Sequence, residues 1–210
     1  MAIGPSPTRW LTPARLDRLE QISIVLLWVL LVRRVITASN PLAPLLLIAE
    51  TAVVIFVLVR RPTEAISLRP GDWLLAITAT FTPLLIQPTG TPAALHALIP
   101  LGVGLVVIGN LVQLAAKLFL RRSFGIAPAN RGIKTGGVYK LVRHPMYAGY
   151  LLVHIGILLL MPSVFNFTIY AISWSAQILR LLAEERLLSE DAAYRAFCLK
   201  TRWRLIPGVF

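Results

Sequence analysis

The sequence has little acid and almost no cysteine, and both shortages limit what this chain can be. Asp and Glu number 9 against 21 Lys and Arg, and charged residues make up only 14% of the 210 positions. Cys198, the single cysteine, cannot form an intrachain disulfide or a cysteine-rich metal site, so we expect an inert, partly buried thiol. His96 and His154 have no second histidine or acid close enough in the sequence to predict a metal site. We expect His96 in a short outer loop and His154 as a buried, hydrogen-bonded residue.

Apolar residues, by contrast, dominate the chain. They make up 57% of it and the mean hydropathy is +0.74, which is more apolar surface than a soluble domain of this length can bury. The long Leu, Ile and Val runs lack the polar alternation of transmembrane strands, and helices are then the remaining way to cross a bilayer. We therefore predict an all-α, polytopic transmembrane helical bundle, a multi-pass integral membrane protein.

The net charge of +12 comes from short basic clusters beside apolar runs. No aromatic-rich basic face and no known binding motif accompanies the charge, which argues against a nucleic-acid partner. The clusters instead indicate topology and contact with anionic headgroups, so we expect membrane lipids as partners.

Six apolar runs divide the chain, and turn-forming pairs such as Met161-Pro162 separate them. The runs cover residues 20–38, 42–60, 73–88, 97–118, 145–161 and 164–181. We interpret them as about six spans in three parts: a cytoplasmic or interfacial arm (1–19), four N-terminal transmembrane helices (20–118) and a C-terminal core with two more (119–210). The first run is interpreted as a retained span and not a secretory signal, because Arg33 and Arg34 follow it directly. No internal repeat and no Gly-x-x-x-Gly pair within a span is present in the sequence.

Lys and Arg are concentrated in alternate connections. Residues 60–72, residues 117–143 and the tail after Leu179 are basic, whereas residues 86–97 and 162–166 contain no Lys or Arg. Because positive residues are retained on the cytoplasmic side, this pattern places the long loop and both termini in the cytoplasm. Arg33 and Arg34 fall on the opposite side, where they either snorkel to the headgroups or belong to a half-buried helix.

A first polar cluster, Arg143-His-Pro-Met-Tyr147, stands where the long basic loop becomes an apolar run. Proline suits the first turn of a helix, so we expect His144 at or next to the cap and Tyr147 one turn further on. The positive end of the helix dipole then points to the cytoplasm and favours an anionic group there.

A second polar cluster lies on the last apolar run. Its members are spaced by four, three and four residues and form one polar stripe: Ser173, Gln177, Arg180 and Glu184. Glu185 falls on a different face, and the stretch from Glu190 to Lys200 predicts an amphipathic cytoplasmic helix. The tight turn after Met161 predicts an antiparallel hairpin, which brings both clusters to the same end. Taken singly, these residues are equally well explained as interfacial anchors or a helical ion pair, but together they predict one shared pocket.

The C-terminal part contains several motifs in a fixed order: Gly137-Val-Tyr-Lys-Leu-Val-Arg-His-Pro-Met-Tyr-Ala-Gly149, Arg180-x-x-x-Glu184-Glu185, Tyr194 and Leu205-Ile-Pro-Gly208. From about Ser123 onward the chain resembles the isoprenylcysteine carboxyl methyltransferase family of integral membrane methyltransferases. Phospholipid N-methyltransferases and small-thiol methyltransferases of membranes have similar C-terminal patterns.

This resemblance implies that S-adenosylmethionine is bound as a cofactor on the cytoplasmic side. The residues that it places around the cofactor are Arg131, Gly132, Ile133, Lys134, Tyr139, His144, Pro145, Met146, Tyr147 and Glu184. It also implies that Arg180 faces a carboxylate of the substrate, and we expect Gln177 of the same stripe to contact the substrate too. Arg180 and Glu184 are then the residues expected to act in catalysis.

The chemistry of the residues agrees with this resemblance. A methyl sulfonium is a cation, which aromatic faces such as those of Tyr139 and Tyr147 stabilise. A carboxylate acceptor needs orientation by Arg180 and no base, whereas an amine acceptor needs a base such as Glu184, Glu185 or His144. We expect methylation of a lipophilic or lipidated acceptor, with isoprenylcysteine-type O-methylation as the leading reaction. The alternatives within this class are phospholipid N-methylation and small-thiol S-methylation. Those from other classes are an NADPH-dependent, sterol-type membrane reductase and a non-catalytic transporter or assembly subunit.

Overall fold

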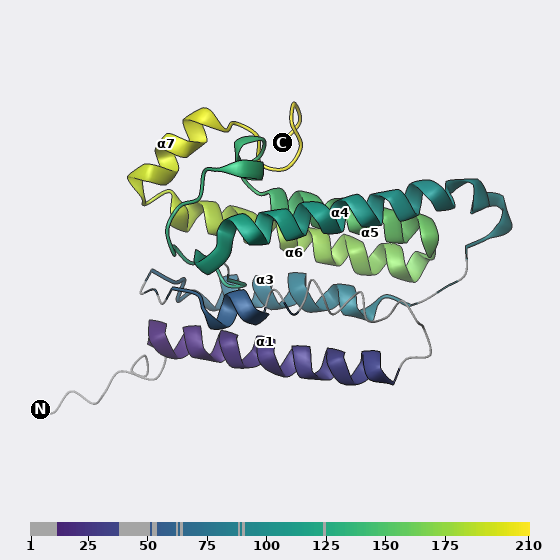
Figure 1. Ribbon diagram of the computed structural model, residues 1–210, viewed down its shortest axis with the longest axis horizontal. Coiled ribbons are helices and arrows are strands. Elements are labelled where there is room, and N and C mark those ends of the chain that lie inside the picture. The colour runs from purple at the N-terminus through teal and green to yellow at the C-terminus, as the bar shows by residue number, and fades with distance from the viewer. Residues whose placement is uncertain are drawn as a thin grey trace, which may run out of the picture.

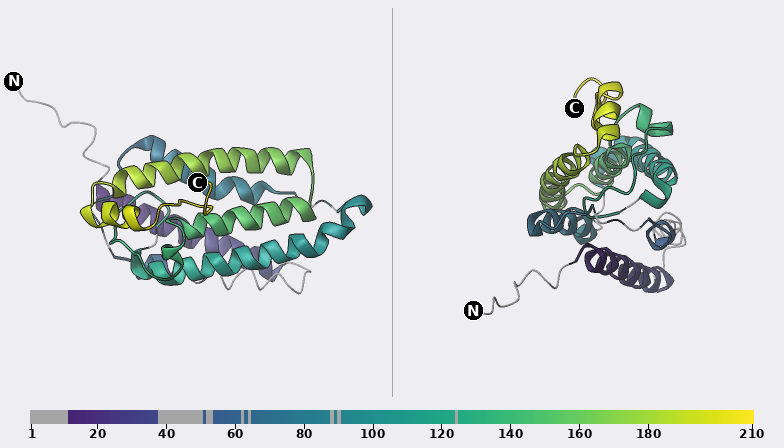
Figure 2. Two further views of the ribbon diagram at one scale, coloured as in Figure 1. Left: turned by 90° about the horizontal axis from the view of Figure 1, so that it is seen from above. Right: turned by 90° about the vertical axis from the view of Figure 1, so that its left-hand side faces the viewer.

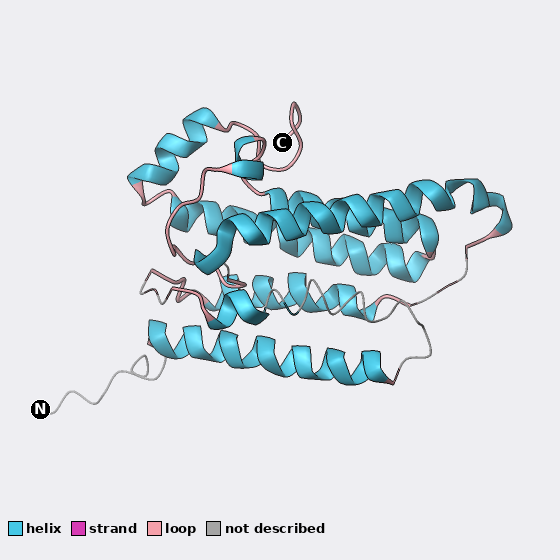
Figure 3. Ribbon diagram, viewed as in Figure 1, coloured by secondary structure: helices cyan, strands magenta, loops and turns pink. Residues whose placement is uncertain are grey.

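A computed structural model describes residues 12–37, 51, 54–61, 63, 65–87, 89, 91–123 and 125–210. These residues form helices and loops without a β-strand, and one isolated antiparallel bridge joins Ile66 to Ala129 (Figure 3). The all-α class predicted from the sequence is therefore confirmed over the described part of the chain.

The long helices lie side by side, and the short elements gather at one end of the bundle (Figures 1 and 2). The α-helices are α1 (Pro13–Ile36), α3 (Pro70–Phe81), α4 (Ile99–Leu120), α5 (Pro145–Leu160), α6 (Val164–Leu188) and α7 (Ala192–Lys200). Between them lie the 3-10 helices η2 (Thr82–Leu85), η3 (Ala93–Leu98), η4 (Arg121–Ser123) and η5 (Gly137–Lys140). The loop before α3, the end of α4, the beginning of α5, the end of α6 and all of α7 share the left-hand end in Figure 1. The basic connections thus meet at one end of the bundle.

Local sequence explains where these helices begin. Proline occupies the first turn of α3, α4 and α5, where a missing N–H costs nothing. The Ser163 side chain caps α6 by accepting from the Asn166 amide at 3.0 Å, and Asp191 caps α7 by accepting from the Ala193 amide at 2.8 Å. The expected hairpin and the expected C-terminal amphipathic helix are both present.

Several expected boundaries differ from the observed ones. α1 runs without a break from Pro13 to Ile36, so the last part of the predicted arm, from residue 13, and the predicted first span are one helix. α3 ends at Phe81, before the end of the apolar run at 88, because the Thr82-Pro83 sequence continues as a 3-10 turn. Residues 1–11 and most of the run 42–60 lie outside the described residues.

One described stretch, Ala93–Ser123, is both long and apolar enough to cross a membrane, and Pro145–Leu160 is a shorter apolar helix. The count of about six spans therefore stays a prediction, as do the multi-pass topology and the cytoplasmic orientation.

α4 and α5 pack against each other through glycines. A Cβ atom at Gly109 would lie 2.7 Å from the Gly149 carbonyl oxygen, and one at Gly156 would lie 2.6 Å from the Gly102 carbonyl oxygen. The two contact glycines of each helix, Gly102 with Gly109 and Gly149 with Gly156, are seven residues apart and therefore do not form a Gly-x-x-x-Gly motif. Small residues let the two backbones approach closely, and this contact holds the end of α4 beside the beginning of α5.

α6 is held between α5 and α3 by polar contacts along its length. Near its beginning, the side-chain amide of Asn166 donates to the Gln87 backbone carbonyl at 2.9 Å. Midway, the Trp174 indole N–H donates to His154 Nδ1 at 3.1 Å, and near the end Arg186 pairs with Asp72 of α3 at 2.6 Å. The Trp174–His154 contact joins α6 to α5, and because the two helices are antiparallel the end of α6 lies beside the beginning of α5, as the hairpin predicts.

Candidate active site

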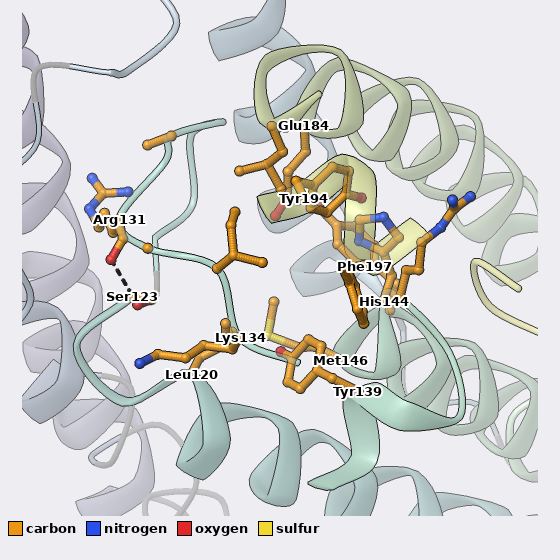
Figure 4. Close-up of a pocket in the computed structure, with 16 residues that line it drawn as sticks. Leu120, Ser123, Arg131, Lys134, Tyr139, His144, Met146, Glu184, Tyr194 and Phe197 are labelled. Atoms are coloured by element: carbon orange, nitrogen blue, oxygen red, sulfur yellow. Dashed lines mark hydrogen bonds between the residues drawn. The ribbon is translucent and has the colours of Figure 1, made fainter. Parts of the chain in front are cut away.

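A pocket opens at the end of the bundle where the two polar clusters meet (Figure 4). In Figure 4 the chain that carries Arg131 and Lys134 lies on one side of the pocket, and Glu184, Tyr194 and His144 lie on the other. The lining residues are Leu120, Ser123, Ala129, Arg131, Gly132, Ile133, Lys134, Tyr139, Arg143, His144, Met146, Tyr147, Glu184, Leu188, Tyr194 and Phe197.

One wall of the pocket is the connecting loop, residues 125–136, between α4 and η5. The Ser123 hydroxyl donates to the Arg131 carbonyl at 3.0 Å (Figure 4), and the Gly132 amide donates to Asn130 Oδ1 at 2.9 Å. Gly132 has a φ of 97°, a left-handed conformation that favours glycine, so the loop turns here toward Ile133 and Lys134. The Asn130 amide also donates to Asp191 Oδ2 at 2.9 Å and joins the loop to α7.

Tyr147 joins the first cluster to the second. Its hydroxyl donates to Glu184 Oε2 at 3.0 Å, and its ring stands edge-on to His144 with the two centroids 5.5 Å apart. The guanidinium of Arg180 lies 5.4 Å from the centroid of the same ring. The two clusters are therefore parts of one site, as the hairpin predicts.

Arg180 is buried with few partners. It is 5% exposed, its only hydrogen bond in the described structure is a long one of 3.5 Å to Gln177 Oε1, and its Nε atom has none. A buried cation without a paired carboxylate is costly, and an anion beside it would offset that cost.

Glu185 is the central acceptor behind the pocket, a role that the sequence interpretation did not foresee. Its carboxylate lies 3.2 Å from His144 Nε2, 3.0 Å from Arg143 Nε and 2.8 Å from Arg204 Nε. The Tyr194 hydroxyl also donates to it, at 3.3 Å. Burial alone raises the pKa of this carboxyl, but hydrogen bonds from His144 and Arg204 and the charge of Arg143 lower the pKa to about 2. Glu185 is thus a charged structural centre that fixes the first cluster, α7 and the tail.

The phenols around the pocket stay neutral. Burial, and then the charge of Glu184, raise the pKa of Tyr139, while burial and the charge of Glu185 raise the pKa of Tyr194. Both rings also belong to the apolar core at this end of the bundle, beside Met146 and Phe197. They therefore offer the pocket aromatic surface and no negative charge.

The structure places most of the predicted site residues in the pocket. Those that line it are Ile133, Lys134, Tyr139, His144, Met146, Tyr147 and Glu184. Pro145 is fully buried in the first turn of α5 behind the lining, and Arg180 and Gln177 lie one and two turns deeper along α6 than Glu184. Arg131 and Gly132, which the resemblance also places around the cofactor, line the pocket as well. The remaining lining residues were not predicted as site residues: Leu120, Ser123, Ala129, Leu188 and Phe197 have no polar pattern that marks them, whereas Arg143 and Tyr194 belong to the quoted motifs.

The remaining histidines lie away from the pocket. His154 is buried and accepts from Trp174, which confirms the expected hydrogen-bonded residue. His96 lies in η3, where its Nε2 is 3.1 Å from the Thr91 carbonyl oxygen. Within the described ranges, no group of three or more His, Cys, Asp or Glu side chains is arranged to hold a metal ion.

Comparison with known families gives one match. Residues 95–194 match the family model of the phospholipid methyltransferases. The matched region contains α4, the connecting loop, both polar clusters and the Tyr194 side of the pocket. No curated protein matches the chain. The matched region is thus similar to a family of membrane methyltransferases in the same superfamily as the isoprenylcysteine carboxyl methyltransferases. The narrower resemblance to the isoprenylcysteine enzymes stays a prediction.

Proposed function

We propose that this chain is an integral membrane methyltransferase that uses S-adenosylmethionine to methylate a lipid-borne acceptor. One observation carries the proposal. Tyr139, His144 and Tyr147 from the first motif and Glu184 from the second line the same pocket. These four residues also lie within the region that matches the phospholipid methyltransferases.

The residues of the pocket fit the donor chemically. When bound, S-adenosylmethionine supplies a methyl group on a sulfonium cation. The carboxylate of Glu184 and the rings of Tyr139 and Tyr147 attract a cation. Lys134 forms no ion pair with the described residues, so its ammonium is available to a carboxylate. Apolar side chains, among them Leu120 and Leu188, offer a surface for a purine ring.

The pocket has to widen to hold such a donor. Its cavity volume is about 70 Å³, which is room for a few water molecules. We therefore expect lining side chains to change rotamer on binding while the backbone of the connecting loop stays in place, as is common when a partner binds.

Tyr147, Glu184 and Glu185 have different roles in the proposed reaction. Methyl transfer depends on an in-line approach, so a site that holds donor and acceptor close supplies much of the rate. Tyr147 orients Glu184 toward the pocket through the 3.0 Å hydrogen bond. Glu185 is held by His144 and Arg204 with a pKa of about 2, so it is a poor base, and Glu184 is the better placed one.

The acceptor carries an anionic group that binds Arg180. The buried guanidinium has one long hydrogen bond, to Gln177, and lies against the ring of Tyr147 at the inner edge of the site. Either a carboxylate or a phosphate of the acceptor can accept charge-assisted hydrogen bonds from this guanidinium. A phospholipid amine places a phosphate close to the methylated nitrogen, and the family match supports this acceptor first. A prenylated cysteine carboxylate, supported by the sequence motifs, is the second candidate.

One experiment tests the activity and the acceptor together. Purified protein and a native lipid extract are incubated with isotopically labelled S-adenosylmethionine, and mass spectrometry identifies the labelled product. Label on a headgroup amine supports the first acceptor and label in a carboxyl ester supports the second. Absence of labelled product, together with oxidation of NADPH on addition of a sterol, contradicts the proposal in favour of a reductase.

A binding measurement tests the site itself. The variants His144→Ala and Glu184→Ala are expected to lose saturable binding of labelled S-adenosylmethionine while they keep the helical circular dichroism of the parent. Ser175→Ala is the control, because Ser175 is exposed on α6 and its hydroxyl bonds within its own helix, to the Ala171 carbonyl. Unchanged binding in both site variants contradicts the proposed pocket.

A further inference from the structure

A buried group of four charges lies near the beginning of α1, next to the connecting loop. Arg60 donates to Asp17 Oδ1 at 2.8 Å, to the Asp17 carbonyl at 2.7 Å and to Glu20 Oε1 at 2.9 Å. Arg131, from the loop, donates to Asp17 Oδ1 and lies 3.9 Å from Glu20 Oε2. The two arginine side chains are 0% and 1% exposed, and the two carboxylates balance their charge.

This group holds the loop at two points. Glu20 Oε1 accepts from the Ile126 amide, at the beginning of the loop, and Asp17 holds the side chain of Arg131 near its middle. Asp17 and Glu20 are three residues apart on α1, so one helix face presents both carboxylates. A rigid helix therefore sets the position of the loop.

The loop glycine at 125 leaves room for this arrangement. A Cβ atom there would lie 2.5 Å from Arg131 Nη1 and 3.3 Å from Glu20 Oε1. Gly136, in the same loop, has no neighbour within 4 Å of its Cβ position and an ordinary φ of −94°. The two glycines thus differ in whether a methyl group disturbs the charges.

The residue that the group holds is part of the pocket wall. Arg131 lines the pocket and is followed by Gly132, Ile133 and Lys134, which line it as well (Figure 4). The carboxylates that hold Arg131 come from α1, outside the region 95–194 that matches a known family. The family match thus contains the wall of the pocket but not the residues that position it.

We propose that Asp17 and Glu20 are positioning residues for the donor: through Arg131 and Ile126 they set the pocket wall from Arg131 to Lys134 before the donor binds. The inference rests on the proposed function, because it takes the pocket to be the donor site. A wall that is already in place costs less conformational entropy to order on binding, so loosening it weakens donor affinity. The chemical step itself lies on the other side of the pocket, so kcat changes little.

The test uses two variants that loosen the wall by different means. Glu20→Gln removes one charged partner, and Gly125→Ala displaces the Arg131 guanidinium without changing any charge. Gly136→Ala is the matched control in the same loop. Loss of one member of a buried ion pair is strongly destabilising, so Glu20→Gln can fail to fold. In that case Gly125→Ala alone tests the proposal.

Two measurements are made on each folded variant. Hydrogen exchange of the amides of residues 126–134 is followed in the ligand-free protein, and the Kd for labelled S-adenosylmethionine is measured by equilibrium dialysis. We expect faster exchange and a Kd raised about tenfold, the effect of one charged hydrogen bond, with kcat within about twofold of the parent. Gly136→Ala is expected to match the parent in both measurements.

The outcomes separate the two proposals. Failure of the parent protein to bind S-adenosylmethionine contradicts the proposed function, whereas the exchange measurement still reports whether α1 holds the loop. Binding by the parent with an unchanged Kd in the loosened variants overturns the positioning role, as does unchanged exchange of residues 126–134. A fall in kcat with no change in Kd also overturns it.

Discussion

Tyr147, in the first turn of α5, donates its phenol proton to Glu184 Oε2 near the end of α6, at 3.0 Å. The two residues are 37 positions apart in the chain, and the helical hairpin is what brings them together. This hydrogen bond closes the pocket between the two motifs and orients the carboxylate that faces the proposed donor.

Replacing Tyr147 by Phe removes this hydrogen bond and keeps the ring. A hydrogen bond to a charged group is worth about 1.5–3 kcal/mol, so we expect the Kd for S-adenosylmethionine to rise about tenfold to a hundredfold. Equilibrium dialysis with the labelled donor measures the change, with Ser175→Ala on the exposed face of α6 as control. An affinity equal to that of the parent shows that the orientation of Glu184 does not depend on Tyr147.

Replacing Arg180 by Gln removes the buried cation at the inner edge of the site. We expect the KM for the lipid acceptor to rise about tenfold to a hundredfold, because a charged hydrogen bond to the acceptor is lost, while the donor Kd stays within about twofold. Steady-state kinetics at saturating donor measure the first quantity and dialysis measures the second. Arg180→Lys keeps the charge without the planar guanidinium. Its KM for the acceptor is therefore expected to lie between that of the parent and that of Arg180→Gln. Weaker donor binding with an unchanged acceptor KM is the result that contradicts this role.

Removing the charge of Glu185 leaves the side chains of His144, Arg143 and Arg204 without their shared anionic partner. We expect Glu185→Gln to lower the free energy of unfolding by an amount on the order of 2 kcal/mol at neutral pH. Thermal unfolding in detergent, followed by circular dichroism, measures the loss. A midpoint equal to that of the parent at pH 7 would show that the contacts of Glu185 contribute nothing net.

The same carboxylate predicts a pH dependence. The pKa of Glu185 is lowered from 4.5 to about 2 in the folded protein, so its stabilisation is fully present above pH 4.5 and is lost as the pH falls toward 2. The difference in melting temperature between the parent and Glu185→Gln should be constant from pH 7 to about 5 and then shrink between about 4.5 and 2. A difference that does not change down to pH 3 contradicts this assignment.

The glycine contact between α4 and α5 predicts a pair of opposite results. At Gly149 a Cβ would lie 2.7 Å from the Gly109 carbonyl oxygen and 2.7 Å from Gln113 Cγ, so Gly149→Ala should destabilise the protein by about 1–3 kcal/mol. Gly104, on the same helix as Gly109, has no neighbour within 4 Å of its Cβ position. Gly104→Ala should be neutral or stabilising by up to about 1 kcal/mol. Thermal unfolding of both variants checks the pair, and equal effects would contradict the close approach.

Local pattern in the sequence was enough for the elements of the site. Pro145 after a basic loop marks the beginning of α5, and the spacing of Gln177, Arg180 and Glu184 puts them on one helix face. The short turn between the last two apolar runs then requires an antiparallel hairpin, so the meeting of the two clusters follows from distances along the chain. The seven-residue glycine spacing was present in the same sequence, but it indicates close packing only when both helices are known to face each other.

Glu185 shows where that reasoning ends. The sequence by itself determined the helical class and the apolar character of the chain. It also determined that Glu185 lies on a different face of α6 from the polar stripe. Its partners, His144 and Arg204, come from the beginning of α5 and from the tail beyond α7, and Asp17 and Glu20 meet Arg131 from more than a hundred residues away. Helical periodicity reports which side chains share a face, but the tertiary structure alone decided what each face meets. Such contacts depend on how distant segments return to one another, and no local spacing encodes that.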